Sequence, residues 1–346
     1  MMVGFRDARV RSLGRRRAVM AVTAALVLVA GTATAVAVGS GNSVAWAFSN
    51  AAGQSSVSTA GFPSGAGQAG IFTDRCAYSH SLADDPILAP NDPRAAMHHD
   101  FYGNTSTSAT STAKTLVGGN TTCTASADAS AYWTPVIYQN GIALTPGTAL
   151  IYWRRPAGDI ATVQTVPVGL QMIAGNEAAT APQSTSVAAW TCSGAHGLRS
   201  ATPTPHDCAG SDLRLVVTFP SCWDGHTLTG AGQHNVVYRT ATGCPPSNPI
   251  QIPQIVFHVT YPTSSAAGLT VSMTPTMSGS TDTEHVDFIN GWNEATLTGD
   301  VSACLATSTR CGPVTGTDAT PQGGKTRTDR RTGKMHARKT KPKANH

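Results

Sequence analysis

Charged and aromatic residues are scarce in this chain, and the scarcity excludes several classes of protein. Of its 346 residues, 12% are charged and 6% are aromatic, whereas 34 are glycine. Exposed helical surfaces are usually filled with Glu, Lys and Leu, so the composition disfavours a helical protein. Runs of Thr and Val interrupted by Gly and Pro favour short strands joined by turns. We therefore expect a mostly β protein.

Basic charge is also scarce in the body of the chain, although the formal net charge is +5. Residues 1–17 hold six arginines, and the tail after Cys311 holds nine Lys or Arg. This leaves nine of the 24 basic residues and 16 of the 19 acidic residues for the body, which has a single lysine, Lys114. A nucleic-acid groove needs clustered Lys and Arg. We expect no nucleic-acid binding by the body.

Common catalytic and cofactor motifs are missing. The chain contains no Gly-x-Ser-x-Gly elbow, no His-Glu-x-x-His helix and no Cys-x-x-Cys pair. A literal G-x-G-x-x-G spans residues 65–70, but it lies in a Gly- and Ser-rich stretch without a preceding strand. A dinucleotide site requires a strand before this motif and a helix after it. We expect no dinucleotide cofactor, and any other cofactor is left open.

The eight cysteines predict disulfides. Their spacings do not suit zinc fingers, whose ligands come in pairs two to four residues apart. An even number of cysteines in an exported chain favours bridges, and eight allow 105 pairings. The pairing we consider joins neighbours along the chain: Cys76–Cys123, Cys192–Cys208, Cys222–Cys244 and Cys304–Cys311.

The first 47 residues have the pattern of an export signal or an N-terminal membrane anchor. A basic start is followed by the uncharged residues 18–39 and by small-residue cleavage sites such as Ala33-Thr34-Ala35. The apolar run approaches the ~20 residues that span a bilayer, so an uncut anchor is the alternative to cleavage. The predicted location is secreted or anchored at the extracellular face of the membrane, with membrane contact only through this segment.

The rest of the chain divides into three parts. Residues 48–70 form a Ser/Gly/Ala-rich linker, residues 71–312 a single β-rich domain, and residues 313–346 a basic tail with almost no apolar residues. The tail is either a disordered solubilising end or an electrostatic strap onto anionic polymer or lipid. The domain is expected to be a disulfide-stapled β-sandwich or jelly-roll-like body with long loops.

Local patterns place elements within this domain. The turn Asn140-Gly141 is typical of a hairpin. Short helices are expected around Ser111–Leu116 and Asn293–Leu297. The strand candidates are Ala149–Trp153, Ala161–Val166, Leu213–Phe219, Ile255–Tyr261 and Leu269–Met273.

Three stretches concentrate His, Asp and aromatic residues and read as loops. They are residues 76–104, 219–226 and 284–292. Motifs in and around them include Asp100-Phe101-Tyr102-Gly103-Asn104, Ser130-Ala131-Tyr132-Trp133-Thr134-Pro135, Trp190-Thr191-Cys192, Cys244-Pro245 and Asp287-Phe288-Ile289-Asn290-Gly291-Trp292. With these motifs the chain resembles the DUF1996 family of secreted actinomycete and fungal proteins, a domain of unknown function. Fungal relatives sometimes carry wall- or cellulose-binding modules, so the resemblance implies polysaccharide surroundings.

The chain also departs from that family. Met97 stands where the family has the first of two histidines, and Asn235 and Asn248 stand where histidine is common. These departures weaken any role carried over to those positions. His80, His99 and His285 match the family pattern.

One hypothesis is a polysaccharide hydrolase. Such enzymes need two carboxyl groups across the glycosidic bond. The candidate carboxylates are Asp85, Asp100, Asp224 and Asp287, with His99 and His285 beside them. Trp133, Trp223 and Trp292 are candidates for stacking on sugar rings, although Trp also fills cores and Asp also caps turns.

A second hypothesis is a metal site drawn from His80, His99, Asp100, His285 and Asp287, because imidazole with carboxylate suits zinc, copper or iron. A third is a non-catalytic structural or binding module of the envelope. Cell-wall or extracellular polysaccharide is the partner that we expect, as hydrolase substrate or as bound ligand. The first two predict that the segments around residues 97–104 and 284–292 converge on one cleft. The oligomeric state is left open.

Overall fold

The computed structural model describes residues 70–156, 163–193, 199–203, 208, 210–307 and 309–313. The predicted export segment, the linker up to residue 69 and the tail from residue 314 lie outside these residues. In the described part of the chain, no helix is both long enough and apolar enough to cross a bilayer.

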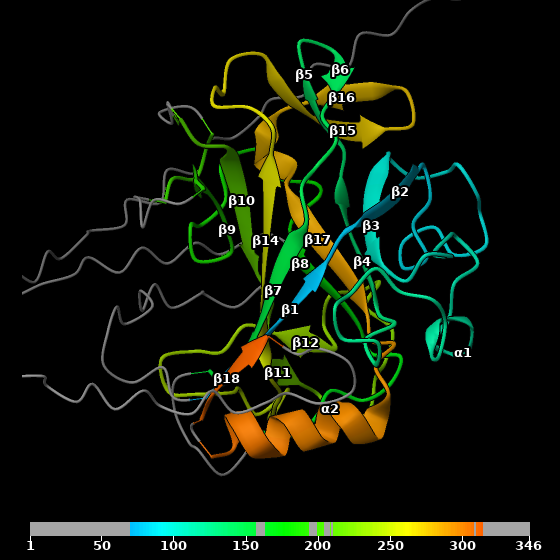
Figure 1. The fold of residues 1–346 in the computed structure, drawn as a ribbon, viewed down its shortest axis with the longest axis vertical. Helices are drawn as coiled ribbons and strands as arrows, with labels where there is room; N and C mark the ends of the chain where they lie inside the picture. The colour runs from blue at the N-terminus through cyan, green and yellow to red at the C-terminus, as the bar shows by residue number, and fades with distance from the viewer. Residues whose placement is uncertain are drawn as a thin grey trace, which may run out of the picture. The chain divides into compact units, whose positions relative to one another are not determined.

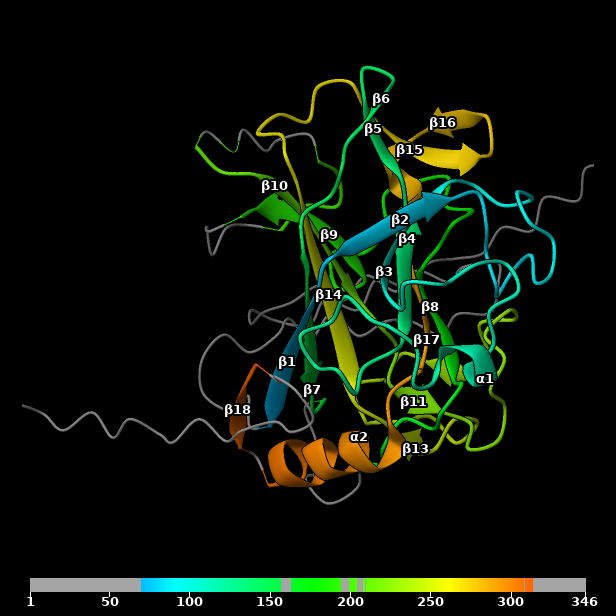
Figure 2. The ribbon, with the colours of Figure 1, turned by 45° about the vertical axis from the view of Figure 1, so that its right-hand side comes forward.

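Two β-sheets face each other across a common core, so the domain is mostly β with a sandwich at its centre (Figures 1 and 2). The first sheet has six strands in the order β18 (Arg310–Pro313), β1 (Ile71–Cys76), β7 (Ala149–Arg154), β14 (Gln254–Tyr261), β10 (Leu213–Thr218) and β9 (Ala188–Cys192). The second has five in the order β2 (Tyr78–Leu82), β3 (His99–Gly103), β4 (Ala131–Pro135), β17 (His285–Ile289) and β8 (Gln171–Gly175). Nearly all pairs are antiparallel, the pair β1–β18 being parallel.

Two smaller sheets lie at opposite ends of the sandwich in Figure 1. At the top are β5 (Ile137–Gln139), β6 (Ile142–Ala143), β15 (Leu269–Thr274) and β16 (Met277–Gly279). Near the bottom are β11 (Cys222–Trp223), β12 (Val236–Val237) and β13 (Ile250–Gln251). The helices are short: α1 (Ala113–Leu116), the 3-10 turn η2 (Thr281–Thr283) and α2 (Glu294–Asp300), which continues into the π-helical η3 (Val301–Leu305).

The core forms because alternate side chains of each strand point inward. Leu213, Leu215 and Val217 of β10 are buried in the shared core with Phe257 of β14 and Phe288 of β17. This is the period of two that the sequence predicts for a half-buried strand. A second, smaller cluster around Phe101 and Trp133 lies on the other face of the five-stranded sheet.

Most predicted elements are confirmed, and one strand is not. Four of the five strand candidates coincide with β7, β10, β14 and β15, and both short helices are present. Of the candidate Ala161–Val166, the first two residues lie outside the described ones, and residues 163–166 are not a strand. The carbonyl of Val166 accepts a hydrogen bond from the side chain of Asn290, so it does not join a ladder.

The Asn140-Gly141 turn joins β5 to β6 as a two-residue hairpin. Asn140 has φ 52° and Gly141 has φ 79°. Two consecutive positive φ angles define the turn type whose twist matches antiparallel strands, and Asn-Gly is its preferred pair.

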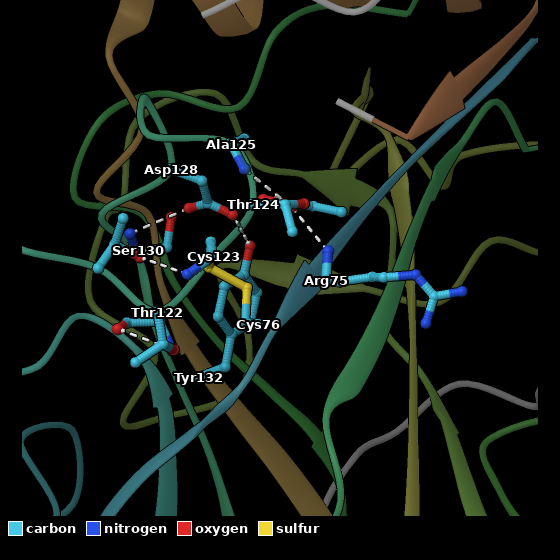
Figure 3. The surroundings of a disulfide bond; sticks show 12 residues. Arg75, Cys76, Thr122, Cys123, Thr124, Ala125, Asp128, Ser130 and Tyr132 are labelled. Atoms are coloured by element: carbon cyan, nitrogen blue, oxygen red, sulfur yellow. Dashed lines mark hydrogen bonds between the residues drawn. A yellow bond between two sulfur atoms is a disulfide. The ribbon is translucent and has the colours of Figure 1, made fainter. Parts of the chain in front are cut away.

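Four disulfides join Cys76 to Cys123, Cys192 to Cys208, Cys222 to Cys244 and Cys304 to Cys311. They are the pairs between neighbours along the chain, and no free cysteine is left among the described residues. Figure 3 shows the surroundings of Cys76–Cys123, which ties the end of β1 to the segment before β4. Such a set of bridges indicates an oxidising compartment.

Candidate metal centre

Two of the predicted loops are in fact built around strands of the five-stranded sheet. β3 and β17 flank β4, and their registers place Phe101 and Asp287 on either side of Trp133. Residues directly opposite each other in a sheet share a face, and side chains alternate along each strand. His99, His285 and Asp287 therefore lie on one face, the face that carries the smaller apolar cluster.

These three side chains form a compact and fully enclosed group. His99 is 1% exposed, and His285 and Asp287 are 0% exposed. One ligand atom from each lies within 4.8 Å of the other two. His285 Nε2 is 3.3 Å from Asp287 Oδ2, and the two imidazole rings meet edge to face with centroids 5.8 Å apart.

The other ring nitrogen of each histidine is held by the backbone. His99 Nδ1 lies 3.0 Å from the carbonyl oxygen of Asp84, and His285 Nδ1 lies 2.8 Å from that of Thr283. A carbonyl oxygen can only accept, so each Nδ1 carries the proton. In the neutral rings, each Nε2 then presents a lone pair, and neither Nε2 has a hydrogen-bond partner among the described residues.

Burial keeps both imidazoles neutral. Desolvation, with the nearby His285, lowers the pKa of His99 to about 3. Desolvation likewise lowers the pKa of His285. The pKa of Asp287 is raised well above its usual value, first by burial and then by the charges of Asp85 and Glu177. Neutral imidazole is the form that binds metals.

Two further carboxylates lie close enough to act on this group through their charge. Asp85 is buried, and its Oδ1 accepts hydrogen bonds from the backbone N–H groups of Ile87 (2.7 Å) and Leu88 (2.9 Å). Glu177 is partly exposed and follows Gly175, the cross-strand partner of His285. Asp85 is among the carboxylates predicted from the sequence, and Glu177 is not. The sequence signal for Glu177 is the rarity of glutamate in the chain.

Asp100 is not part of this group. Its cross-strand partner is Thr134, so its side chain lies on the opposite face of the sheet from Asp287. There Asp100 Oδ1 accepts a hydrogen bond of 2.6 Å from Ser81 Oγ, and burial raises the pKa of Asp100 to about 7. Asp100 and Asp287 are therefore not arranged across one space, as an acid and base pair would have to be.

The remaining candidates have other roles in the structure. Both ring nitrogens of His80 have partners, Ser79 Oγ at 2.8 Å and the carbonyl of Thr107 at 2.9 Å, and its ring stacks on Phe101. Asp224 holds a turn by accepting from the N–H groups of His226 and Thr227.

The tryptophans proposed for sugar stacking are enclosed. Trp133 and Trp292 are 0% exposed, so they fill the core and offer no face to a ligand. Trp223 is partly buried, and its Nε1 donates to the carbonyl of Thr227.

A family model described as a domain of unknown function (DUF1996) matches residues 85–292, a range that includes all three residues of the candidate site. No curated protein and no solved structure matches the chain.

Proposed function

Because the chain belongs to the family described as a domain of unknown function (DUF1996), its function has to be argued from its own residues, and we propose that the domain binds one divalent transition-metal ion. The ligands are His99 Nε2, His285 Nε2 and the carboxylate of Asp287. All three lie on one face of the five-stranded sheet, on β3 and β17.

One observation carries the proposal: two buried imidazole nitrogens and a buried carboxyl group face one another, and none of them has a hydrogen-bond partner among the described residues. Buried polar atoms in native proteins almost always have hydrogen-bond partners, because a buried polar atom without one lowers the stability of the folded state by about 1–3 kcal/mol. A proton shared between His285 and Asp287 would give that pair a hydrogen bond but would leave His99 Nε2 without a partner. A cation satisfies all three atoms together.

The chemistry of the donor set indicates which ions fit. Two imidazoles and one carboxylate suit zinc, copper or iron. Three protein ligands would leave the fourth position of a tetrahedral ion for a water molecule. A metal bound there would lower the pKa of its water towards neutrality. Asp85 and Glu177 add negative charge around the site, which favours retention of the cation.

The setting of this site is part of the proposal. We place it outside the cytoplasm, because the four disulfides need an oxidising compartment and residues 1–47 have the pattern of an export signal or anchor. A polysaccharide-related role stays a prediction.

Metal titration of the purified chain tests the proposal. After dialysis against a chelator, the protein should bind one Zn(II) or Co(II) per chain by isothermal titration calorimetry. His99→Ala, His285→Ala and Asp287→Asn should each weaken binding at least about 100-fold, since each removes one of three ligands. Asp287→Asn keeps the shape of the side chain and replaces a protonated carboxyl group by an uncharged amide, so it should fold even if the alanine variants do not.

A surface His–Asp pair provides the control. His226 Nε2 lies 3.6 Å from Asp224 Oδ2, and the His226 side chain is 79% exposed. His226→Ala should bind metal as the wild type does. Absence of binding by the wild-type chain, or unchanged binding by Asp287→Asn, would refute the metal site.

A further inference from the structure

We infer that Asp84 is the positioning residue of the metal site: its carboxylate clamps the segment 83–96 so that its own backbone carbonyl holds the Nδ1–H of His99. This inference rests on the proposed function. The carbonyl of Asp84 bonds to Nδ1 of His99 and not to the proposed ligand atom Nε2, and Asp84 is not among the residues predicted from the sequence.

The two histidines are oriented in different ways. His285 donates to the carbonyl of Thr283, two residues earlier in the same segment and at the end of the turn η2. Its orientation is therefore set locally. His99 donates to the carbonyl of Asp84, which lies 15 residues earlier and outside β3. The orientation of His99 therefore depends on how the segment before β3 is held.

The side chain of Asp84 holds that segment from two sides. Its Oδ1 accepts a hydrogen bond of 2.8 Å from the N–H of Arg94, and its Oδ2 accepts one of 3.0 Å from the N–H of Ala109. Asp84 is 5% exposed, so these bonds are shielded from water. The N–H of Ala96 also donates to the carbonyl of Ala83 at 3.1 Å, and this hydrogen bond joins the two ends of the segment 83–96.

The hydrogen bonds that fix the Asp84 carbonyl therefore decide which nitrogen of His99 can bind a metal. A neutral imidazole has one N–H and one lone pair, and a fixed acceptor at Nδ1 places the lone pair on Nε2. If the carbonyl of Asp84 moves, the ring can rotate and either tautomer can form. Loss of such an orienting partner typically costs about 10–100-fold in metal affinity.

Asp84→Asn and Asp84→Ala test this inference. Asparagine would turn one acceptor into a donor that faces a backbone N–H, and alanine removes both acceptors. In long-range ¹H–¹⁵N spectra of the metal-free protein, wild-type His99 should show the Nδ1–H tautomer, and both variants should show a mixture. Co(II) affinity should fall about 10–100-fold, and the visible spectrum of the Co(II) form should shift.

The matched control is Asp224→Ala, which also removes an aspartate that accepts two backbone N–H groups, at 2.9 Å each. It should leave the His99 tautomer and the Co(II) affinity unchanged. The inference is overturned if Asp84→Ala keeps the tautomer and binds Co(II) within twofold of wild type, or if Asp224→Ala loses as much affinity. If the tautomer changes as expected but the wild-type chain binds no metal, the proposed function fails while the coupling of Asp84 to His99 stands.

Discussion

The free energy of unfolding should fall as the pH rises from about 4 to about 8, because the pKa values of two neighbouring core carboxyl groups, Asp74 and Asp128, are raised in the folded protein. Both carboxyl groups are 0% exposed. Burial, followed by the charge of Asp74, raises the pKa of Asp128 to about 8, and burial raises the pKa of Asp74 as well. Two carboxylates in contact cannot both ionise without strong repulsion.

The hydrogen bonds around the pair accommodate one negative charge. Asp74 Oδ1 accepts from the N–H groups of Arg75 (2.6 Å) and Ala125 (3.1 Å) and from Thr124 Oγ1 (2.5 Å). Figure 3 shows Asp128 near these residues; its carboxylate accepts from the N–H of Ser130 (3.0 Å) and from the hydroxyl of Tyr132 (2.9 Å). Arg75 bonds through its backbone, and none of these interactions involves a cationic side chain.

The sign of the effect follows from proton binding. Below about pH 4 the folded and unfolded states both hold the protons, and the contribution of the pair to stability is fully present. Between the unfolded pKa and the folded value of about 8, the folded state binds more protons, so each pH unit costs up to about 1.4 kcal/mol. Urea denaturation at pH 5, 6, 7 and 8 measures this slope.

Asp128→Asn isolates the pair from other titrating groups. The amide can donate to Asp74 and still accept from the N–H of Ser130, so the variant should fold. Its slope should be smaller than that of the wild type by the contribution of the pair, while Asp100, Glu284 and Asp287, whose pKa values burial also raises, keep their own contributions. A wild-type slope that Asp128→Asn leaves unchanged would show that the pair does not contribute to it.

Removal of the Cys76–Cys123 disulfide should lower the free energy of unfolding by about 4 kcal/mol, because the bridge closes a loop of 47 residues and so restricts the unfolded chain. Removal of Cys304–Cys311, with a separation of 7, should cost only about 2.4 kcal/mol by the same relation. Each pair is replaced by alanine, and urea denaturation gives the two values.

The Cys76–Cys123 bridge should also be coupled to the carboxyl pair. Cys123 precedes Thr124 and Ala125, whose groups donate to Asp74. Neighbouring changes that share partners are rarely additive. The disulfide variant combined with Asp128→Asn should therefore deviate from the sum of the separate effects by at least about 0.5 kcal/mol.

Equal losses from the two disulfides would contradict the loop-length argument.

Local patterns along the chain predicted much of the fold. The alternation from Leu213 to Phe219 identified β10, since a half-buried strand needs that period. Asn140-Gly141 identified a hairpin because few other pairs tolerate its backbone angles. The strand expected at 161–166 is wrong for its described residues, since the polar partner of Val166, Asn290, is 124 positions away in the sequence.

The candidate site was predicted in part. His99, His285 and Asp287 were among the proposed ligands, and the structure brings them together. Asp100 was grouped with them because its segment read as a loop, in which neighbouring residues can point the same way. In a strand, residues 99 and 100 point to opposite faces, so the secondary structure alone separates Asp100 from the site.

The amino-acid sequence by itself determined the mostly β class of the domain, the segregation of charge into the two ends of the chain, and the residue types able to bind a metal. These depend on composition and on short-range periodicity. Only the tertiary structure decided which histidines meet, which nitrogen of each is free, and that Asp84 and Glu177 bear on the site. Such relations depend on strand register and on contacts between distant segments, which no local pattern in the chain encodes.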